Sequence, residues 1–340
     1  MWINSPLRLL HSNVDRGFTN TLEHMNILVT GAAGFIGSHL CERLLALGHS
    51  VRGIDNFSPY YDVALKEENA RSIQAAGASM HRLDLAADPL AEAVAGVHVV
   101  FHAAAQPGLS AASFDTYVRN NIYATHRLLE ALNDSPSLTG FVNIATSSVY
   151  GSFATEPETA EVRPTSYYGV TKLAAEQLAM ASARDRGLPA CSVRLYSVYG
   201  PRERPDKLYP KLIRALQENT PLPLYEGSEL HRRSYTYIDD ILDGLIAVLN
   251  RWDRCAGEIF NIGTDTVITT GEGIRLVEDL FGKRAVIQRL PRRAGDQTAT
   301  QANISKARRV LDYHPVVLPT EGLRRTVAWF REFFQRFPRR

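Results

Sequence analysis

The sequence predicts an α/β fold: a doubly wound parallel sheet followed by a smaller C-terminal α/β lobe. Three observations lead to this prediction. A short β-branched strand at 26–30 runs into Gly31, Gly34 and Gly37 and then into a helix. Apolar strand-like segments alternate with helical segments as far as residue 199. Beyond that point polar turns and shorter elements replace the alternation.

The composition is typical of an ordinary globular protein. The 340 residues carry 38 basic and 36 acidic side chains, so the net charge of +2 favours neither a nucleic-acid nor a membrane partner. The 3 scattered cysteines argue against a disulfide or zinc framework, and we expect no metal site and a cytoplasmic location. Residues 1–24 lack the apolar core of a signal peptide. We expect a disordered extension there; the alternative is an upstream start codon, with the folded domain beginning at Met25.

The segment 26–55 has the pattern of a dinucleotide-binding unit. Gly31 allows a tight turn, Gly34 lets the backbone approach a pyrophosphate, and Gly37 lets the helix pack on the strand. The next strand ends on Asp55, whose carboxylate would accept hydrogen bonds from ribose hydroxyls and repel a 2′-phosphate, so NAD is favoured over NADP. The alternative is an ordinary βαβ start with a surface aspartate. The residues expected to contact the cofactor here are Gly31, Gly34, Phe35, Ile36, Gly37, Asp55 and Asn56.

Two later strands also end where a cofactor could bind. A strand at 80–85 leads to Asp84 and Leu85; Asp84 would either accept from the adenine amino group or cap the following loop. An apolar strand over 97–105 enters a turn of small side chains, which leaves room for a cofactor. The turn residues are Ala103, Ala104 and Ala105.

An amphipathic helix is predicted over 115–133, with Asn120 and Asn121 unusual inside it. Asn121 is assigned to the cofactor site; the alternatives are that one asparagine bonds a neighbouring strand or that both are exposed. Further strands are predicted at 140–145, 190–198, 221–226 and 259–262, and further helices at 38–47, 167–186, 208–217, 241–250, 270–280, 305–311 and 320–334.

Two regions are expected from this order of elements. Residues 25–199, with about 234–262, would form the nucleotide-binding domain. Residues 200–233 and 263–340 would form the substrate-binding lobe, so the chain would cross between the two more than once.

Tyr168 and Lys172 lie one helical turn apart on one face of a predicted helix. A tyrosine must lose its proton to act as a base, and a nearby ammonium lowers the pKa of the phenol. Thr146 follows a strand end and could hydrogen-bond the substrate hydroxyl. Together these residues would remove a proton from a secondary alcohol while hydride leaves to NAD. An exposed helix pair is the alternative for the Tyr-x-x-x-Lys spacing alone.

These motifs are similar to those of one family. From residue 25 to about 335 the chain resembles the extended short-chain dehydrogenase/reductases, specifically the NAD-dependent nucleotide-sugar epimerases and dehydratases. The resemblance implies a Rossmann domain, a C-terminal substrate lobe and a homodimer formed through helices at about 115–133 and 167–186. The motifs lie at 30–37, 102–105, 146–151, 168–172, 194–201 and 233–240.

The strand end after Thr146 distinguishes the reactions of this family. The dehydratases of the family carry a sequence similar to Thr-Asp-Glu at this strand end, and the decarboxylases carry a glutamate at the position of Ser148. Ser147 and Ser148 therefore disfavour both reactions. C4 epimerisation remains: oxidation at C4, rotation of the 4-keto sugar and return of hydride to the other face.

Among the epimerases, the run 199–206 is most similar to that of UDP-glucuronate 4-epimerases. Their sites line the C5 carboxylate with hydroxyl groups, which hold it in either sugar orientation, whereas a glutamate would repel it. The positions that match are Thr146, Ser147, Ser148 and Ser197. The alternatives are a UDP-glucose or UDP-N-acetylhexosamine 4-epimerase, serines that only cap a turn, and a non-catalytic NAD-binding protein.

The family positions also imply ligands for the nucleotide, because arginine offers paired donors to phosphate. Arg204, Arg233 and Arg293 are expected to bind the diphosphate. Asp296 is expected to reach the uridine ribose, and Lys211 to serve as a second cation. A surface role is the alternative for each.

Overall fold

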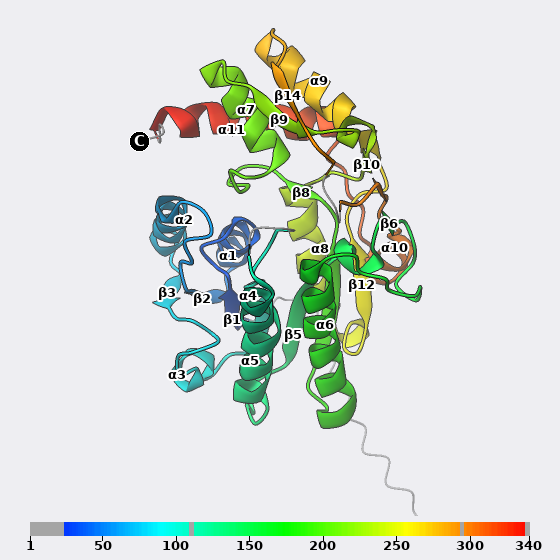
Figure 1. Ribbon diagram of the computed structural model, residues 1–340. Helices are drawn as coiled ribbons and strands as arrows, with labels where there is room; N and C mark the ends of the chain where they lie inside the picture. The colour runs from blue at the N-terminus through cyan, green and yellow to red at the C-terminus, as the bar shows by residue number, and fades with distance from the viewer. Residues whose placement is uncertain (1–23, 109–111, 293–295, 337–340) are drawn as a thin grey trace, which may run out of the picture.

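The computed structural model describes residues 24–108, 112–292 and 296–336 (Figure 1). Its central sheet has seven strands in the order β12-β7-β5-β4-β1-β2-β3, and neighbouring strands are parallel. The order reverses between β1 and β4, which confirms the doubly wound fold and places a crevice at the carboxyl ends of these strands. The bounds are Asn26–Thr30 (β1), Ser50–Asp55 (β2), Ser79–Arg82 (β3), Val99–His102 (β4), Gly140–Thr146 (β5), Ala190–Leu195 (β7) and Ile259–Ile262 (β12).

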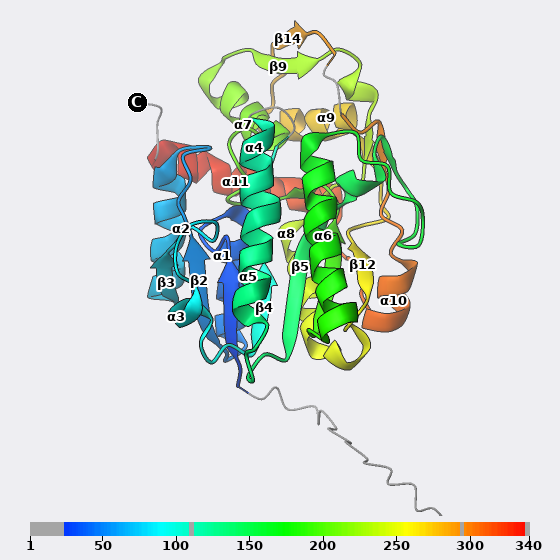
Figure 2. The ribbon, with the colours of Figure 1, turned by 60° about the horizontal axis from the view of Figure 1, so that its bottom comes forward.

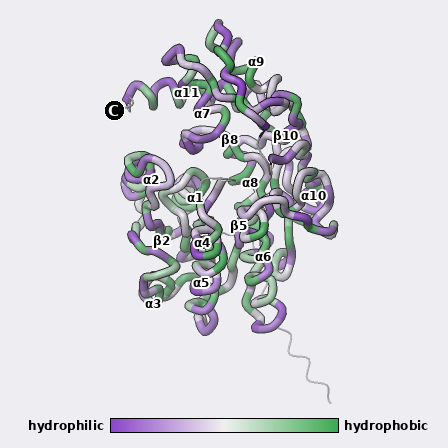
Figure 3. The backbone as a smooth tube through the Cα atoms, in the orientation of Figure 1, coloured by the Kyte–Doolittle hydropathy of each residue, from purple (hydrophilic) through white to green (hydrophobic). Residues whose placement is uncertain are grey.

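Helices cover both faces of this sheet (Figures 1 and 2). Ile27 and Val29 of β1 belong to the same buried cluster as Leu40, whereas Leu28 belongs to a second cluster with Leu128, because side chains alternate along a strand. In Figure 3 hydrophobic and hydrophilic stretches alternate along the outer helices, as amphipathic helices require. One face carries α1 (Phe35–Ala46), α2 (Val63–Ala75) and α8 (Ile238–Asn250); the other carries α3 (Ala91–Val94), α5 (Ala124–Leu132) and α6 (Tyr167–Arg186).

A second group of elements lies beyond one end of the sheet (Figure 1). Three helices contact one another there: α7 (Leu208–Glu218), α9 (Thr270–Phe281) and α11 (Pro319–Arg336). The strands of a small sheet, in spatial order, are β13 (Ile268–Thr269), β10 (Arg232–Arg233), β15 (Ala299–Thr300) and β6 (Phe153–Ala154). Two further pairs are β8 (Val198–Tyr199) with β11 (Thr236–Tyr237), and β9 (Leu222–Tyr225) with β14 (Ile287–Leu290); α10 (Ser305–Leu311) contacts β12.

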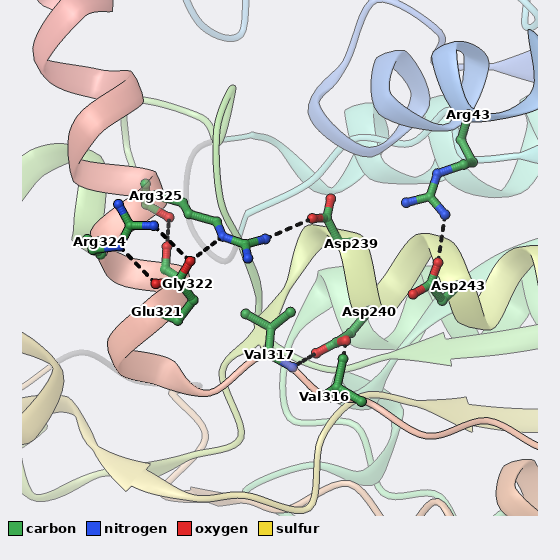
Figure 4. Close-up of polar contacts among 11 residues, drawn as sticks. Arg43, Asp239, Asp240, Asp243, Val316, Val317, Glu321, Gly322, Arg324 and Arg325 are labelled. Atoms are coloured by element: carbon green, nitrogen blue, oxygen red, sulfur yellow. Dashed lines mark hydrogen bonds and ion pairs between the residues drawn. The ribbon is translucent and has the colours of Figure 1, made fainter. Parts of the chain in front are cut away.

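Helix α8 connects the two groups (Figure 4). Asp240 accepts hydrogen bonds of 3.0 Å from two amides of the segment before α11. Arg43 of α1 pairs with Asp243 at 2.7 Å, and Arg325 of α11 reaches Asp239 at 3.5 Å. One helix therefore holds the sheet layer on one side and the C-terminal helix on the other.

The prediction of one continuous α-helix over 115–133 is wrong. The structure has α4 (Phe114–Tyr117), a π-helical turn at Val118–Tyr123 and then α5. The predicted strands also end earlier at two places. The strand near 80–85 stops at Arg82, and the one over 190–198 leaves the main sheet after Leu195 because β8 pairs with β11 instead.

The expected extension at 1–24 lies outside the described residues, apart from residue 24. Within the described ranges, no helix has the length and apolar character needed to span a membrane. The same ranges hold no cluster of histidine, cysteine and acidic side chains that could bind a metal ion.

Candidate active site

The glycine turn after β1 fits a pyrophosphate. Gly31 has a φ of +69°, and a Cβ there would lie 2.8 Å from the amide nitrogen of Ala104. A Cβ on Gly37 would lie 2.2 Å from the carbonyl oxygen of Gly31, so only glycine lets α1 approach β1 this closely. Within the described part of the chain, the first turn of α1 after Gly34 carries no acidic side chain and no side-chain cap. The helix N-terminus therefore presents amides and a positive dipole end to an anion.

Asp55 is buried at the end of β2, beside this turn. Its carboxylate oxygens accept the amides of Ala33, at 3.1 Å, and Phe57, at 2.8 Å. Burial raises the pKa of Asp55, and the positive charge of Lys66 lowers it. Each oxygen keeps a lone pair, so the held carboxylate can still accept from a ribose hydroxyl. Asn56 next to it accepts the amide of Ser58 at 3.0 Å.

Asp84 makes the capping bond that was one of its two predicted roles. Its carboxylate accepts the amide of Ala86 at 2.9 Å and the guanidinium of Arg119 at 2.8 Å. Burial raises its pKa, but the hydrogen bonds with Arg119 and Ala86 outweigh burial and hold the pKa below its usual value. Leu85 is buried in the core beneath it. A role towards adenine stays a prediction.

The small-residue turn after β4 is held from two sides. The amide of Ala104 donates to the Thr30 hydroxyl at 3.1 Å. The side-chain oxygen of Asn121 accepts the amide of Gln106 at 2.6 Å, and its nitrogen donates to Thr171 of α6 at 2.9 Å. Ala103 and Ala105 flank Ala104 and are half-buried. Asn121 thus joins the turn, the π-helical segment and α6.

Tyr168 and Lys172 share the first turns of α6. Burial raises the pKa of the Tyr168 phenol, while a hydrogen bond with Thr146 and the charge of Arg204 lower it. Lys172 is 2% exposed, and burial lowers its pKa to about 8 although the carboxylate of Glu176 raises it. The structure therefore brings Thr146 to Tyr168 and places an ammonium one helical turn away.

The end of β5 presents hydroxyl groups beside Tyr168. The Thr146 hydroxyl donates to the Ser148 hydroxyl and accepts the Ser148 amide, both at 3.2 Å. Ser147 is buried at the start of the short helical turn Ser147–Tyr150. Ser197 lies at the bend between β7 and β8, where its carbonyl accepts the Thr236 amide at 3.1 Å.

The cations predicted for the diphosphate come from different elements: Arg204 from the loop before α7, Lys211 from α7 and Arg233 from β10. Arg204 forms a two-point ion pair of 3.0 Å with Asp206, lies over the ring of Tyr60 at 5.2 Å and acts on the pKa of Tyr168. Arg204 therefore lies close enough to Tyr168 for its charge to act on the phenol. Lys211 is exposed on α7.

Arg233 and Asp296 surround His231 instead. Arg233 lies 3.4 Å from the His231 ring nitrogen. Burial lowers the pKa of His231, Arg233 lowers it further, and the charge of Asp296 raises it. Arg293 lies outside the described residues.

A sequence model of the "NAD dependent epimerase/dehydratase family" matches residues 27–263. The chain belongs to this family. It is 38% identical over 317 residues to the "Uncharacterized UDP-glucose epimerase YtcB" of Bacillus subtilis, covering 92% of this chain and 99% of the relative. It is 35% identical to a UDP-glucuronate 4-epimerase of Thermodesulfobacterium geofontis, covering 90% and 96%. The crystal structure of a Bacillus cereus UDP-glucuronic acid 4-epimerase with UDP-glucuronic acid and NAD superposes with a TM-score of 0.87, at 37% identity, covering 91% and 100%.

Two sets of buried contacts in this family member were not predicted from the sequence, although His102 lies in the motif at 102–105. His102 is buried between the hydroxyls of Thr30, at 2.8 Å, and Thr125, at 2.9 Å, and burial lowers its pKa to about 3, so the ring is neutral. Glu176 pairs with Arg194 at 2.6 Å inside the core. Local spacing signals neither feature, because Arg194 lies on β7 and Thr30 and Thr125 lie on elements distant from His102.

Proposed function

We propose that this epimerase/dehydratase family member is an NAD-dependent C4 epimerase that converts UDP-glucuronate to UDP-galacturonate. The observation that carries the proposal is the hydroxyl-lined turn beside Tyr168. Thr146, Ser147 and Ser148 offer neutral donors at the strand end, and neutral donors suit a C5 carboxylate in either orientation of the sugar. The Bacillus cereus relative binds UDP-glucuronic acid and NAD, as its name states.

In this reaction Tyr168 takes the proton of the C4 hydroxyl and returns a proton after the sugar has turned. Thr146 holds the reacting oxygen through its hydroxyl, and the ammonium of Lys172 favours the phenolate form of Tyr168. NAD, when bound, supplies acceptance and return of hydride. The glycine turn, the Asp55 carboxylate and the alanine turn fit this cofactor in shape and charge.

We propose the following contacts for the remaining site residues. Arg204, Arg233, Lys211 and Arg293 bind the diphosphate, and Asp296 reaches the uridine ribose. Ser197 joins the hydroxyl groups around the sugar carboxylate. Residues 25–199 with about 234–262 form the NAD-binding domain, and 200–233 with 263–340 form the substrate lobe. The protein acts in the cytoplasm as a homodimer.

A neutral sugar is the second candidate substrate. The Bacillus subtilis relative carries the name of a UDP-glucose epimerase. Hydroxyl groups also hydrogen-bond a neutral C6 hydroxymethyl group, so the serine turn alone does not separate the two substrates.

The test is to incubate the purified protein separately with UDP-glucuronate, UDP-glucose and UDP-N-acetylglucosamine, without added NAD, and to follow each sugar by proton NMR. Conversion of UDP-glucuronate alone to its C4 epimer supports the proposal. Conversion of a neutral sugar keeps the reaction and replaces the substrate. A pentose product means decarboxylation.

Ser148→Glu tests the carboxylate pocket. The new carboxylate would repel a uronate, so the variant should lose more kcat/KM with UDP-glucuronate than with UDP-glucose. Equal losses on the two substrates would contradict a pocket for the C5 carboxylate.

A further inference from the structure

A strap from the C-terminal lobe runs along the chain that leaves the serine turn. Here "strap" means residues 297–301, and "serine turn" means residues 146–151. The amide of Thr298 donates to the carbonyl of Ser152 at 2.9 Å, and the amide of Gln301 donates to that of Ala154 at 2.9 Å. Between them β15 pairs in parallel with β6.

Gln297, at the start of the strap, reaches the serine turn itself. Its side-chain nitrogen donates to the carbonyl of Ser147 at 3.2 Å and to that of Gly151 at 3.0 Å. An amide group has two hydrogens, so one side chain can hold both carbonyls. These carbonyls bracket the helical turn that carries Ser148.

The backbone at Gly151 has little room to change conformation if the hydrogen bonds from Gln297 are lost. Its φ is +83°, and a Cβ there would lie 2.2 Å from the carbonyl oxygen of Arg163. The exit of the serine turn is therefore fixed by close backbone contact, and the entry, at Ser147, is where a released turn would shift.

The other side of the strap belongs to the proposed nucleotide site. Asp296 directly precedes Gln297, and its charge acts on His231. Strand β15 pairs with β10, which carries Arg233, and the amide of Arg232 donates to the carbonyl of Thr298 at 3.1 Å. One short segment thus contacts the group around His231 and the serine turn.

We propose that Gln297 is a positioning residue that couples nucleotide binding to the geometry of the serine turn. The inference rests on the proposed function, because it needs a nucleotide at Arg233 and Asp296. Contacts of the nucleotide with that group secure the strap in the position described above. Gln297 then holds the carbonyls of Ser147 and Gly151, which keeps the hydroxyls of Thr146 and Ser148 aligned beside Tyr168.

The first test compares Gln297→Leu with Gln301→Leu. Both replace a strap glutamine by a side chain of similar size, but Gln301 donates to the carbonyl of Asp265 at 3.3 Å, away from the serine turn. We expect Gln297→Leu to lower kcat for UDP-glucuronate about 10- to 100-fold, as misplaced catalytic groups do, and to change the Kd of UDP less than about threefold. Gln301→Leu should match the wild type. An unchanged kcat in Gln297→Leu, or a loss confined to UDP affinity, would overturn the inference.

The second test needs no turnover. Amide hydrogen exchange is followed in the wild type and both variants, with and without UDP. UDP should slow exchange at the amides of Ser148 and Gly151 in the wild type and in Gln301→Leu but not in Gln297→Leu, while the amide of Arg232 is slowed in all three proteins. Slowing at the serine turn in Gln297→Leu, or none in the wild type, would overturn the coupling. If this pattern holds but UDP-glucuronate is not converted, the substrate proposal fails and the coupling stands.

Discussion

At the scale of single residues, burial sets the proton chemistry of the site. Lys172 is buried beside Tyr168, and its pKa falls to about 8, so its ammonium persists at neutral pH. Burial also raises the pKa of Tyr168, while Thr146 and Arg204 lower it. The phenolate therefore depends on positive charge close by, and Lys172 is one helical turn away.

Tyr168→Phe removes the phenol that, as a phenolate, accepts the proton of the sugar hydroxyl. We expect kcat for UDP-glucuronate to fall about 100- to 10,000-fold, while bound NAD is retained. Turnover measured by NMR, with NAD content measured after denaturation, checks this. Tyr167→Phe, on the exposed side of the same turn, is the matched control and should stay active. Near-normal turnover in Tyr168→Phe would remove the base assignment.

Lys172→Met tests the buried charge through stability. The pKa of Lys172 is about 8 in the folded protein and 10.5 in the reference state, so the folded protein binds fewer protons between these values. The charge therefore costs on the order of 3 kcal/mol at pH 7, and the cost declines towards pH 10. With NAD removed, the variant should have the higher free energy of unfolding at pH 7, by a margin that shrinks to about 1 kcal/mol at pH 10.

Denaturant titrations at both pH values measure this margin. Lys211→Met, at an exposed lysine of α7, is the control for the exchange itself and should change the free energy of unfolding by no more than about 0.5 kcal/mol. A margin for Lys172→Met that stays constant between pH 7 and 10 would contradict a lowered pKa.

Asp55→Ala tests the ribose contact. A hydrogen bond to a carboxylate contributes about 1.5–3 kcal/mol, so NAD affinity should fall about tenfold or more. The preference for NAD over NADP should also shrink, because the charge that repels a 2′-phosphate is gone. Calorimetric titration of both cofactors into NAD-free protein measures this. Asp62→Ala, which removes the cap of α2, is the control; equal affinities for Asp55→Ala and wild type would exclude the ribose contact.

The sequence was informative where a residue's role follows from local spacing. The glycines after β1, Asp55 at the next strand end, and the Tyr168–Lys172 spacing all lie within short stretches whose local geometry is set by their own elements. Gln297 and His102 could not be assigned in this way, because their partners lie far along the chain and meet them only in the folded sheet.

At the scale of elements, the π-helical turn is the main departure from what the sequence predicted. The apolar stripe over 115–133 was real and indicated a single helix. The widened turn Val118–Tyr123 puts Asn121 inward, where it bonds Gln106 and Thr171. Hydrophobic periodicity does not detect one extra residue in a turn, and such turns often occur at functional sites. Of the two alternatives for the asparagines, exposure of both is wrong, because Asn121 is buried. A bond to a neighbouring strand is wrong in its partner, because Asn121 bonds a loop and a helix instead.

Asn121→Ala leaves the amide of Gln106 without its acceptor in a buried place. We expect a loss of about 1–3 kcal/mol in the free energy of unfolding, with lower kcat because the alanine turn and α6 lose their link. Asn120→Ala is the control: Asn120 is half-buried, and its side chain accepts a hydrogen bond from the neighbouring Arg119, so stability should change by no more than about 0.5 kcal/mol. Equal changes in the two variants, measured by denaturant titration, would contradict the linking role.

At the scale of the whole molecule, the chain returns to the main sheet after visiting the lobe. Strand β12 comes after the elements α7, β9 and β10, yet it pairs with β7 at the sheet edge. The end of the strand–helix alternation near residue 200 predicted a second region. The strap was not predictable, because two-residue strands such as β6 and β15 have no periodicity to read.

The proposed homodimer gives the last prediction. Four large apolar side chains are exposed on the surface formed by α4, the π-helical turn and α6: Phe114, Tyr123, Tyr167 and Val170. Exposed apolar surface of this kind marks an interface. In a two-fold symmetric dimer, this surface of one protomer would pack against the same surface of its partner. Val170 is 43% exposed in this surface. Val170→Glu would bury one carboxylate of each protomer in the dimer interface, so we expect the protein to become monomeric. Light scattering after size-exclusion chromatography measures this. Val286→Glu, at a 66% exposed position before β14, should leave the dimer intact. A dimer that survives Val170→Glu with unchanged dissociation constant would exclude this surface.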